Sequence, residues 1–321
     1  MTSSLPEPFS PAPMPADWIV PDWPAPANVR AVFTTRAGGV SEGPQATFNL
    51  GYKADDDPEA VRVNRERLRA YTGVPSAWVA QVHGPRVVDA RDALAAAEAG
   101  EPLQADASIT TAVGLASTVM VADCLPVLLC DAGGRAVAAA HAGWRGLCAG
   151  VIEQTVQALR ARLKDEADGA EASVIAWLGP CIGPTAFEVG PEVRAAFLDA
   201  ATPEERDATR AAFVARGAPQ ADKSLADLCA LARLRLAREG VTNVSGGQWC
   251  TVGDPARFYS YRRDRVTGRM AALVWRVSLG RVRRRSGPGG CAMEGGISRR
   301  CGIASQRLGA TDAANAASRN V

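Results

Sequence analysis

Histidine is scarce in this sequence, which has only His83 and His141 in 321 residues. Multicopper oxidase chemistry needs many imidazole ligands for its several coppers, so two histidines exclude it. The sequence also has no Cys-x-x-Cys pair, and Ala-Gly follows His141. Zinc nucleobase deaminases of the HxE type need a paired cysteine and a glutamate two residues after the ligating histidine, so that class is excluded as well.

Membrane and secretion signals are missing too. No apolar run approaches the length of a membrane span, and the Pro-rich start does not resemble a secretory signal. The eight cysteines lack the dense spacing of a disulfide framework, so we expect reduced thiols that are mostly in the core. These absences predict a cytoplasmic protein with no membrane partner.

Charge is unevenly distributed along the chain. Residues 278–321 contain eight arginines but only Glu294 and Asp312 as acids, a local charge of +6 that leaves the rest at −4. A basic surface for nucleic acid would therefore depend on this tail alone, and we expect no nucleic-acid partner. The tail has almost no aromatic or β-branched residues, which predicts a disordered basic extension.

Between the Pro-rich leader at 1–16 and this tail, strand and helix patterns alternate. Helical spacing is expected over 57–71, 147–163, 191–201 and 225–239, and apolar strands over 29–35, 77–83, 86–90, 106–110, 173–178 and 241–250. A final hairpin is expected from 257–264 and 270–277. The linkers are short and no repeat is visible, so 17–277 is predicted to be one catalytic α/β domain of mixed sheets with helices outside.

The stretch from Ser117 to Cys148 is where we place the chemistry. Apolar runs at 118–122 and 126–131 flank Cys124, and a third run at 135–140 leads to His141. His83 closes another apolar run and is also followed by a small residue. Side chains at breaks in regular structure can converge on one pocket, so we expect these three residues to share a site.

Three interpretations of this residue set remain open. Two imidazoles and one thiolate suit zinc, and three protein ligands leave the open position that is typical of catalytic zinc. Alternatively, Cys124 is the nucleophile of a hydrolase or amidase with His141 as its base and no metal, which leaves His83 without a role. In a structural or binding protein, all three would be core residues.

A glycine-rich turn follows the strand at 29–35. It begins at Arg36 and leads to Phe48-Asn49-Leu50-Gly51. Exposed amides and an arginine can hold an anion, but the spacing alone favours an ordinary turn. The phosphate-binding pattern GxxxxGK[ST] is absent.

Seven ordered motifs between about Asp17 and Trp275 strongly resemble the YfiH/PgeF family, also labelled the polyphenol oxidoreductase laccase-domain family. They are TTRAGGVSEGP, FNLG, QVHG, ADCLPVLL, AAHAGWRG, GPCIGP with FEVG, and FYSYRRD with TGRMAALVW. The resemblance implies one domain of sandwiched β-sheets flanked by helices, similar to the cysteine-hydrolase (CNF-like) fold of a deamidating bacterial toxin. It also implies zinc-dependent phosphorolysis of adenosine, inosine, guanosine and methylthioadenosine, with adenosine deamination as a second activity and a link to peptidoglycan editing.

The resemblance also suggests roles for particular residues. The family's metal motif falls on His83, Cys124 and His141, and zinc is expected in preference to copper. Arg36 is our candidate for holding phosphate, Asn49 for a polar contact to the nucleoside, and Asp123 for orienting a metal ligand or relaying a proton. Arg145 and Cys250 are further pocket candidates. The expected partners are purine nucleosides and phosphate, and the protein is expected to be a monomer.

Overall fold

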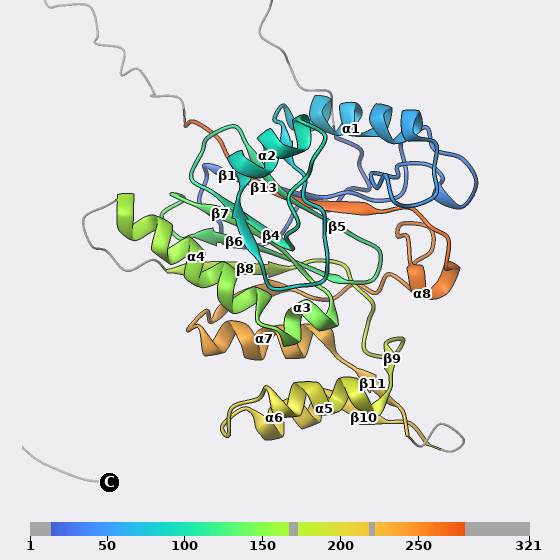
Figure 1. The fold of residues 1–321 in the computed structure, drawn as a ribbon, viewed down its shortest axis with the longest axis vertical. Coiled ribbons are helices and arrows are strands. Elements are labelled where there is room, and N and C mark those ends of the chain that lie inside the picture. The colour runs from blue at the N-terminus through green and yellow to red at the C-terminus, as the bar shows by residue number, and fades with distance from the viewer. Residues whose placement is uncertain (1–13, 167–172, 218–221, 280–321) are drawn as a thin grey trace, which may run out of the picture. The chain divides into compact units, whose positions relative to one another are not determined.

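A computed structural model describes residues 14–166, 173–217 and 222–279. Its strands form three sheets, in the orders β1-β13-β5-β2, β10-β11-β9 and β12-β8-β6-β7-β4-β3 (Figure 1). The strands are β1 (Val29–Phe33), β2 (Ser76–Ala77), β3 (Val87–Asp89), β4 (Ala107–Thr110), β5 (Ala116–Val121), β6 (Leu125–Asp131), β7 (Val137–Ala142), β8 (Val174–Leu178), β9 (Glu188–Val189), β10 (Phe213–Ala215), β11 (Ser224–Ala226), β12 (Asn243–Gly246) and β13 (Met270–Arg276). The helices are η1 (Gly43–Gln45), α1 (Pro58–Thr72), α2 (Ala90–Glu98), α3 (Trp144–Cys148), α4 (Val151–Glu166), α5 (Pro191–Asp199), α6 (Arg206–Ala211), α7 (Leu228–Arg238) and α8 (Tyr261–Asp264).

The four-stranded and six-stranded sheets pack face to face. Side chains alternate along each strand, so one set enters the space between the sheets and the next set faces the helices. On β6, Leu128 and Cys130 join a buried cluster with Phe33 and Val274 of the other sheet. Leu129 lies in the cluster on the opposite face. Both sheets mix parallel and antiparallel pairs.

Helices cover the outer faces of this sandwich. Apolar residues of α4 and α7 share a buried cluster with β6, β7 and β8, and Leu68 of α1 packs with residues of β1 and β13. Helix α1 begins where the Asp57 carboxylate accepts a hydrogen bond from Glu59 N, and it ends at Gly73 with a left-handed φ of 72°. The layer order is therefore helix, sheet, sheet, helix.

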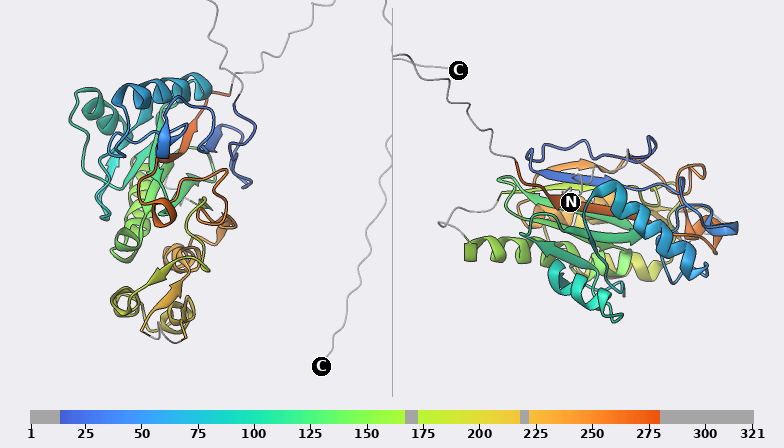
Figure 2. Two further views of the ribbon diagram at one scale, coloured as in Figure 1. Left: turned by 90° about the vertical axis from the view of Figure 1, so that its right-hand side faces the viewer. Right: turned by 90° about the horizontal axis from the view of Figure 1, so that it is seen from above.

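The small sheet β9–β11 lies with α5 and α6 at the opposite end of this unit from α1 (Figures 1 and 2). Phe197 of α5 and Phe213 of β10 pack with ring centroids 5.9 Å apart. Among the described residues, no helix is long and apolar enough to cross a membrane.

The predicted mixed α/β domain with sandwiched sheets is confirmed. Residues 14–279 belong to one compact unit, and the boundaries at 17 and 277 stay predictions. Most of the leader and nearly all of the basic tail lie outside the described residues.

Several expected elements were wrong in detail. The helix expected over 225–239 begins only at α7, because β11 occupies Ser224–Ala226, and the strand expected over 241–250 is regular only at β12. The strand expected over 77–83 is regular only at β2, because beyond it the Gln81 side chain, not a strand, bonds both backbone groups of Met120. The helix expected over 147–163 is broken by Gly150, whose φ is 92°. Residues 257–264 form no hairpin strand, since they end in helix α8 and β13 pairs with β1 and β5.

Candidate metal centre

Cys124 occupies the turn between β5 and β6. The turn is tight enough that Asp123 adopts a left-handed φ of 98°, which non-glycine residues rarely do. Strand β6 begins at the next residue, so the thiol is half-buried at the end of the six-stranded sheet. The sequence prediction of a thiol at a break between two strands is confirmed.

His141 lies on β7, in register with Pro126 of β6. Its side chain is only 3% exposed, and its Nδ1 lies 2.8 Å from Oδ1 of Asp106. The backbone N–H of His141 also donates to the carbonyl oxygen of Asp106 at 2.7 Å. A carboxylate that accepts from Nδ1–H fixes the tautomer and leaves the Nε2 lone pair free to bind a metal.

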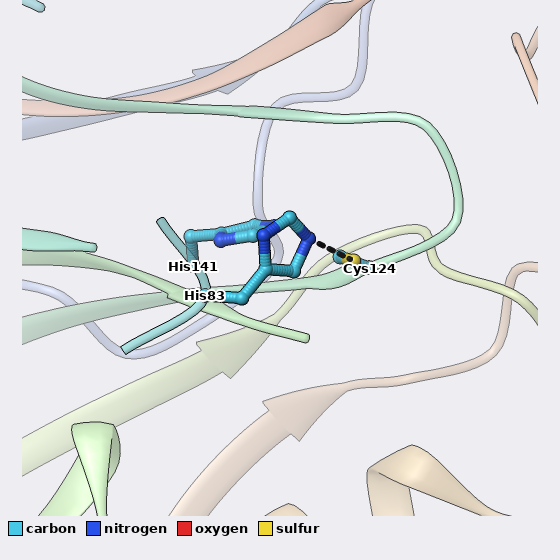
Figure 3. A group of neighbouring side chains, drawn as sticks. All are labelled: His83, Cys124 and His141. Carbon is cyan, nitrogen blue, oxygen red and sulfur yellow. Dashed lines mark hydrogen bonds between the residues drawn. The ribbon is translucent and has the colours of Figure 1, made fainter. Parts of the chain in front are cut away.

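His83 comes from an irregular loop and is exposed. It has a left-handed φ of 61°, and its Nε2 lies 3.8 Å from Sγ of Cys124. Asp106 holds this loop as well, because its carboxylate accepts hydrogen bonds from the backbone N–H groups of Val82, His83 and Gly84. One buried carboxylate therefore positions both histidines. Figure 3 shows the His83 ring pointing toward the Cys124 sulfur beside His141.

The three side chains fit a single metal ion. Their donor atoms all lie within 4.8 Å of one another, and the two imidazole rings are at 78° with centroids 4.8 Å apart. Tetrahedral zinc with ordinary Zn–N and Zn–S bonds separates its ligand atoms by about 3.5 Å, so small movements would suffice. Gly143 leaves the necessary room, since a Cβ there would lie 2.9 Å from Cys124 Sγ and 3.0 Å from His83 Cδ2.

The surroundings favour a charged thiolate. Burial raises the pKa of Cys124, but the positive charge and hydrogen bonds of His141 and His83 outweigh it and lower that pKa to about 6. Burial lowers the pKa of His141, whereas the Cys124 and Asp106 charges raise it to about 9. A thiolate is the form of cysteine that binds metals and acts as a nucleophile.

A cavity of about 720 Å³ opens beside the three side chains. Its wall is largely apolar and aromatic, and it also carries three cationic side chains, Lys53, Arg65 and Arg269. Cavities of this size and character bind small organic ligands. The centre therefore faces a space that can hold a substrate.

Arg36 and Asn49 are not among the residues that line this cavity. The Arg36 guanidinium donates to the carbonyl oxygens of Ala46 and Pro255. Asn49 is fully buried, and its Oδ1 accepts from the N–H groups of Gly51 and Arg269, which do line the cavity. Asn49 thus supports the cavity wall, and the substrate contacts expected of both residues stay predictions.

The Asp123 carboxylate accepts from Thr251 Oγ1 at 2.6 Å and from the N–H of Arg262 at 2.6 Å. It anchors α8 there, while Asp106 has the geometry to orient His141. The predicted role of Asp123 in metal orientation or proton relay stays untested.

The two weaker candidates, Arg145 and Cys250, also lie outside the cavity lining. The Arg145 guanidinium stacks over the Trp144 ring at 4.4 Å, and Cys250 Sγ accepts from Gly183 N at 3.2 Å.

Sequence reasoning missed Asp106, Arg65 and Arg269. Asp106 offered one signal, because it is an acid directly before a buried strand and burying an unpaired carboxylate is costly. The two arginines offered none, since the sequence does not reveal which of its many arginines face a cavity.

Comparisons with known proteins show the family of this chain. Residues 30–277 match the sequence model of a family described as multi-copper polyphenol oxidoreductase laccase. A protein of Escherichia coli (strain K12) named purine nucleoside phosphorylase YfiH is 48% identical over 265 residues, which cover 81% of this chain and 98% of that protein. The chain belongs to the YfiH family.

Other YfiH-family members are similarly close. A purine nucleoside phosphorylase of Pseudomonas aeruginosa is 52% identical over 258 residues, covering 80% of this chain and 98% of that protein. A crystal structure of a Neisseria meningitidis protein assigned to DUF152 has a TM-score of 0.72 and 47% identity, covering 82% of this chain and all of that one. The crystal structure of YlmD from Geobacillus stearothermophilus has a TM-score of 0.69 and 29% identity, covering 78% and 93%.

The family description names several coppers. Both histidines of this chain belong to one three-residue group that could hold a single ion. Their number and placement do not match a multicopper centre.

Proposed function

We propose that this protein is a zinc-dependent purine nucleoside phosphorylase. The observation that carries the proposal is the convergence of His83, Cys124 and His141 on one cavity of about 720 Å³. Relatives that are 48% and 52% identical carry the name purine nucleoside phosphorylase, which supports the same activity here. Adenosine, inosine, guanosine and methylthioadenosine are the proposed substrates.

The protein's own residues prepare the site for this chemistry. Asp106 bonds Nδ1 of His141, so Nε2 is the ring nitrogen that would give up its proton to bind a metal. The neighbouring imidazoles favour the Cys124 thiolate, and the apolar wall limits water around the substrate. Zinc bound there would polarise an oxygen nucleophile.

In phosphorolysis, a phosphate oxygen forms a bond to the anomeric carbon of the ribose while the bond from that carbon to the purine nitrogen breaks. The electron pair of the broken bond leaves with the purine, which takes up a proton. We also propose adenosine deamination, in which water displaces the amine from the ring carbon. We also propose that the protein is a cytoplasmic monomer and that its activity is linked to peptidoglycan editing.

A second candidate is a hydrolase or amidase with Cys124 as nucleophile and His141 as base. The specific observation in its favour is the lowered pKa of Cys124 beside an imidazole that Asp106 orients, an arrangement that activates a nucleophile. In this candidate His83 would only help to lower the pKa of Cys124 and would not be an essential ligand.

The deciding experiment measures zinc per chain and free purine released from inosine and adenosine with and without phosphate. The phosphorylase proposal expects about one zinc and phosphate-dependent release, both lost in Cys124→Ala and in His83→Ala. The hydrolase candidate instead expects no zinc, a Cys124 thiol alkylated at neutral pH only when His141 is present, and activity that is retained in His83→Ala. Full purine release without metal would refute the phosphorylase proposal as stated.

A further inference from the structure

Arg65 is an unusual cation in the cavity wall. Its guanidinium is stacked between the rings of Tyr52 and Trp78, at 4.4 and 4.0 Å from their centroids. Its Nε donates to the carbonyl oxygen of Leu50 at 2.9 Å, and burial lowers its pKa to about 10. A further contact runs from Nη2 to Sδ of Met120 at 3.7 Å, so two aromatic faces and two hydrogen bonds hold the side chain in a fixed orientation.

Arg269 lies in the same wall. Its stem packs so closely on Gly51 that a Cβ at Gly51 would lie 2.7 Å from Cγ of the arginine. Its Nη1 donates to the carbonyl oxygens of Thr267 and Gly268. Burial lowers the pKa of Arg269, although the negative charges of Cys124 and then Asp123 act to raise it.

The backbone ties the two arginines to one short loop. Leu50, which accepts from Arg65, donates its own N–H to the carbonyl oxygen of Arg269. The loop continues through Gly51 to Lys53, an exposed lysine that also lines the cavity. Three positive side chains thus line the same cavity, on or beside one loop.

These cations have spare hydrogen-bonding capacity. Within residues 14–166, 173–217 and 222–279, no ion pair joins Arg65 or Arg269 to a carboxylate. In the same part of the chain, Nη1 of Arg65 and both Nε and Nη2 of Arg269 have no hydrogen-bond partner. Burying an unpaired charge is costly, so such groups are expected to meet an anion.

Cation–π stacking alone does not explain why these cations are buried in the cavity wall. It explains the burial of Arg65, but Arg269 lies over no ring among the described aromatic contacts. Guanidinium groups present N–H donors in a fork that matches phosphate oxygens, and a nearby lysine adds a flexible positive charge.

From these contacts we infer that Arg65, Arg269 and Lys53 form an anion-binding wall that holds a phosphate group in the cavity of the metal centre. The inference rests on the proposed function in taking phosphate as the anion. The phosphate is either free inorganic phosphate or the phosphate of a nucleoside monophosphate. In this inference the wall takes the phosphate-holding role that the sequence suggested for Arg36. The Arg36 guanidinium bonds two carbonyl oxygens and is not part of the cavity lining.

The test uses the full-length protein and measures binding directly, by calorimetry with inorganic phosphate, inosine and inosine monophosphate. The variants are Arg269→Gln, Lys53→Gln and Arg65→Gln, each compared with Arg69→Gln. Arg69 is an exposed arginine of the same helix as Arg65 and lies outside the cavity lining. Lys53 is exposed, so its variant keeps the test valid if a variant of a packed arginine does not fold.

Losing a charged hydrogen-bond donor should weaken phosphate binding roughly tenfold or more in Arg269→Gln, with a smaller loss in Lys53→Gln. Inosine binding should change by less than about twofold, and Arg69→Gln should match the wild type. Arg269→Lys should recover part of the lost binding because it restores the charge without the fork.

The ligands distinguish the two sources of phosphate. If the wall holds inorganic phosphate, inosine monophosphate will bind the wild type no better than inosine does. If it holds a nucleotide's phosphate, inosine monophosphate will bind more tightly than inosine, and Arg269→Gln will remove the advantage. Either result supports the wall.

The inference is overturned if Arg269→Gln and Lys53→Gln bind both phosphate ligands as the wild type does, or if the wild type binds neither. Purine release from inosine is measured in parallel. Absent release with variant-sensitive phosphate binding would refute the phosphorylase proposal and leave the wall standing. Normal purine release with an unchanged phosphate KM in the variants would refute the wall and leave the phosphorylase proposal standing.

Discussion

The two histidines of the centre are held in opposite ways. His141 is buried on a central strand of the six-stranded sheet, whereas His83 is exposed on a loop with a left-handed backbone. The same carboxylate, Asp106, bonds the ring of the first and the backbone of the second. One ligand is therefore part of the core and the other is attached to it, so their removal should affect folding differently even though both affect metal binding.

The largest effects should come from removing each histidine in turn. Both His141→Ala and His83→Ala should lose stoichiometric zinc, because each removes one of three ligands. In chelator-treated protein, His141→Ala should also lower the free energy of unfolding by roughly 3–5 kcal/mol, since it leaves Asp106 buried without its charged partner. His83→Ala should change it by no more than about 0.5 kcal/mol, because the side chain is exposed.

Metal analysis and urea unfolding would check this pair of variants. Equal unfolding free energies for the two variants would contradict the contrast between His141, which is part of the core, and His83, which lies on an exposed loop.

Asp106→Asn should weaken the hydrogen bonds that position both histidines. The new amide group would face the N–H donors of the 82–84 loop or the ring of His141, so at least one of these contacts is lost. Metal affinity should fall roughly tenfold to a hundredfold, as expected for a residue that orients a ligand. Competition with a chromophoric chelator measures it, and an affinity equal to that of the wild type would remove the assignment of Asp106.

Gly143→Ala should disturb the His83 side more than the His141 side. The added Cβ would lie 3.0 Å from His83 Cδ2 but 3.6 Å from His141 Cε1. We expect reduced zinc content in a folded protein that is destabilised by roughly 1–3 kcal/mol.

Gly84→Ala is the matched control for Gly143→Ala. Its Cβ would meet its nearest neighbours at 3.7 and 3.8 Å, which is ordinary contact. Equal zinc content in the two variants would show that the space at Gly143 is not needed.

The smallest effect is expected for Gln81→Ala. Its side chain bonds the N–H and carbonyl oxygen of Met120 and so fastens the segment before His83 to β5. Losing this contact should cost about 1 kcal/mol in urea unfolding. Hydrogen exchange at the Met120 amide should quicken, and unchanged exchange there would contradict the role.

Most elements could be predicted because their signals are local. The helix at 57–71 has its cap at Asp57 and its stop at Gly73, and buried strands such as β6 are continuous apolar runs. The 77–83 segment was mistaken for a strand because its apolar composition does not reveal that Gln81, in place of a neighbouring strand, bonds Met120. Helix α8 was missed because four residues carry too short a pattern, and the Asp123 carboxylate that bonds its Arg262 N–H is 139 positions away.

The sequence by itself determined the candidate ligand set, because a chain with two histidines and one thiol in the ADC motif offers few ways to build such a site. Only the tertiary structure decided that Asp106 would hold both histidines and that Arg65 and Arg269, 204 positions apart in the sequence, would meet at one loop. The physical reason is that burial and charge pairing arise when distant segments pack. An arginine that is desolvated beside a cavity has the same letter in the sequence as one that faces water.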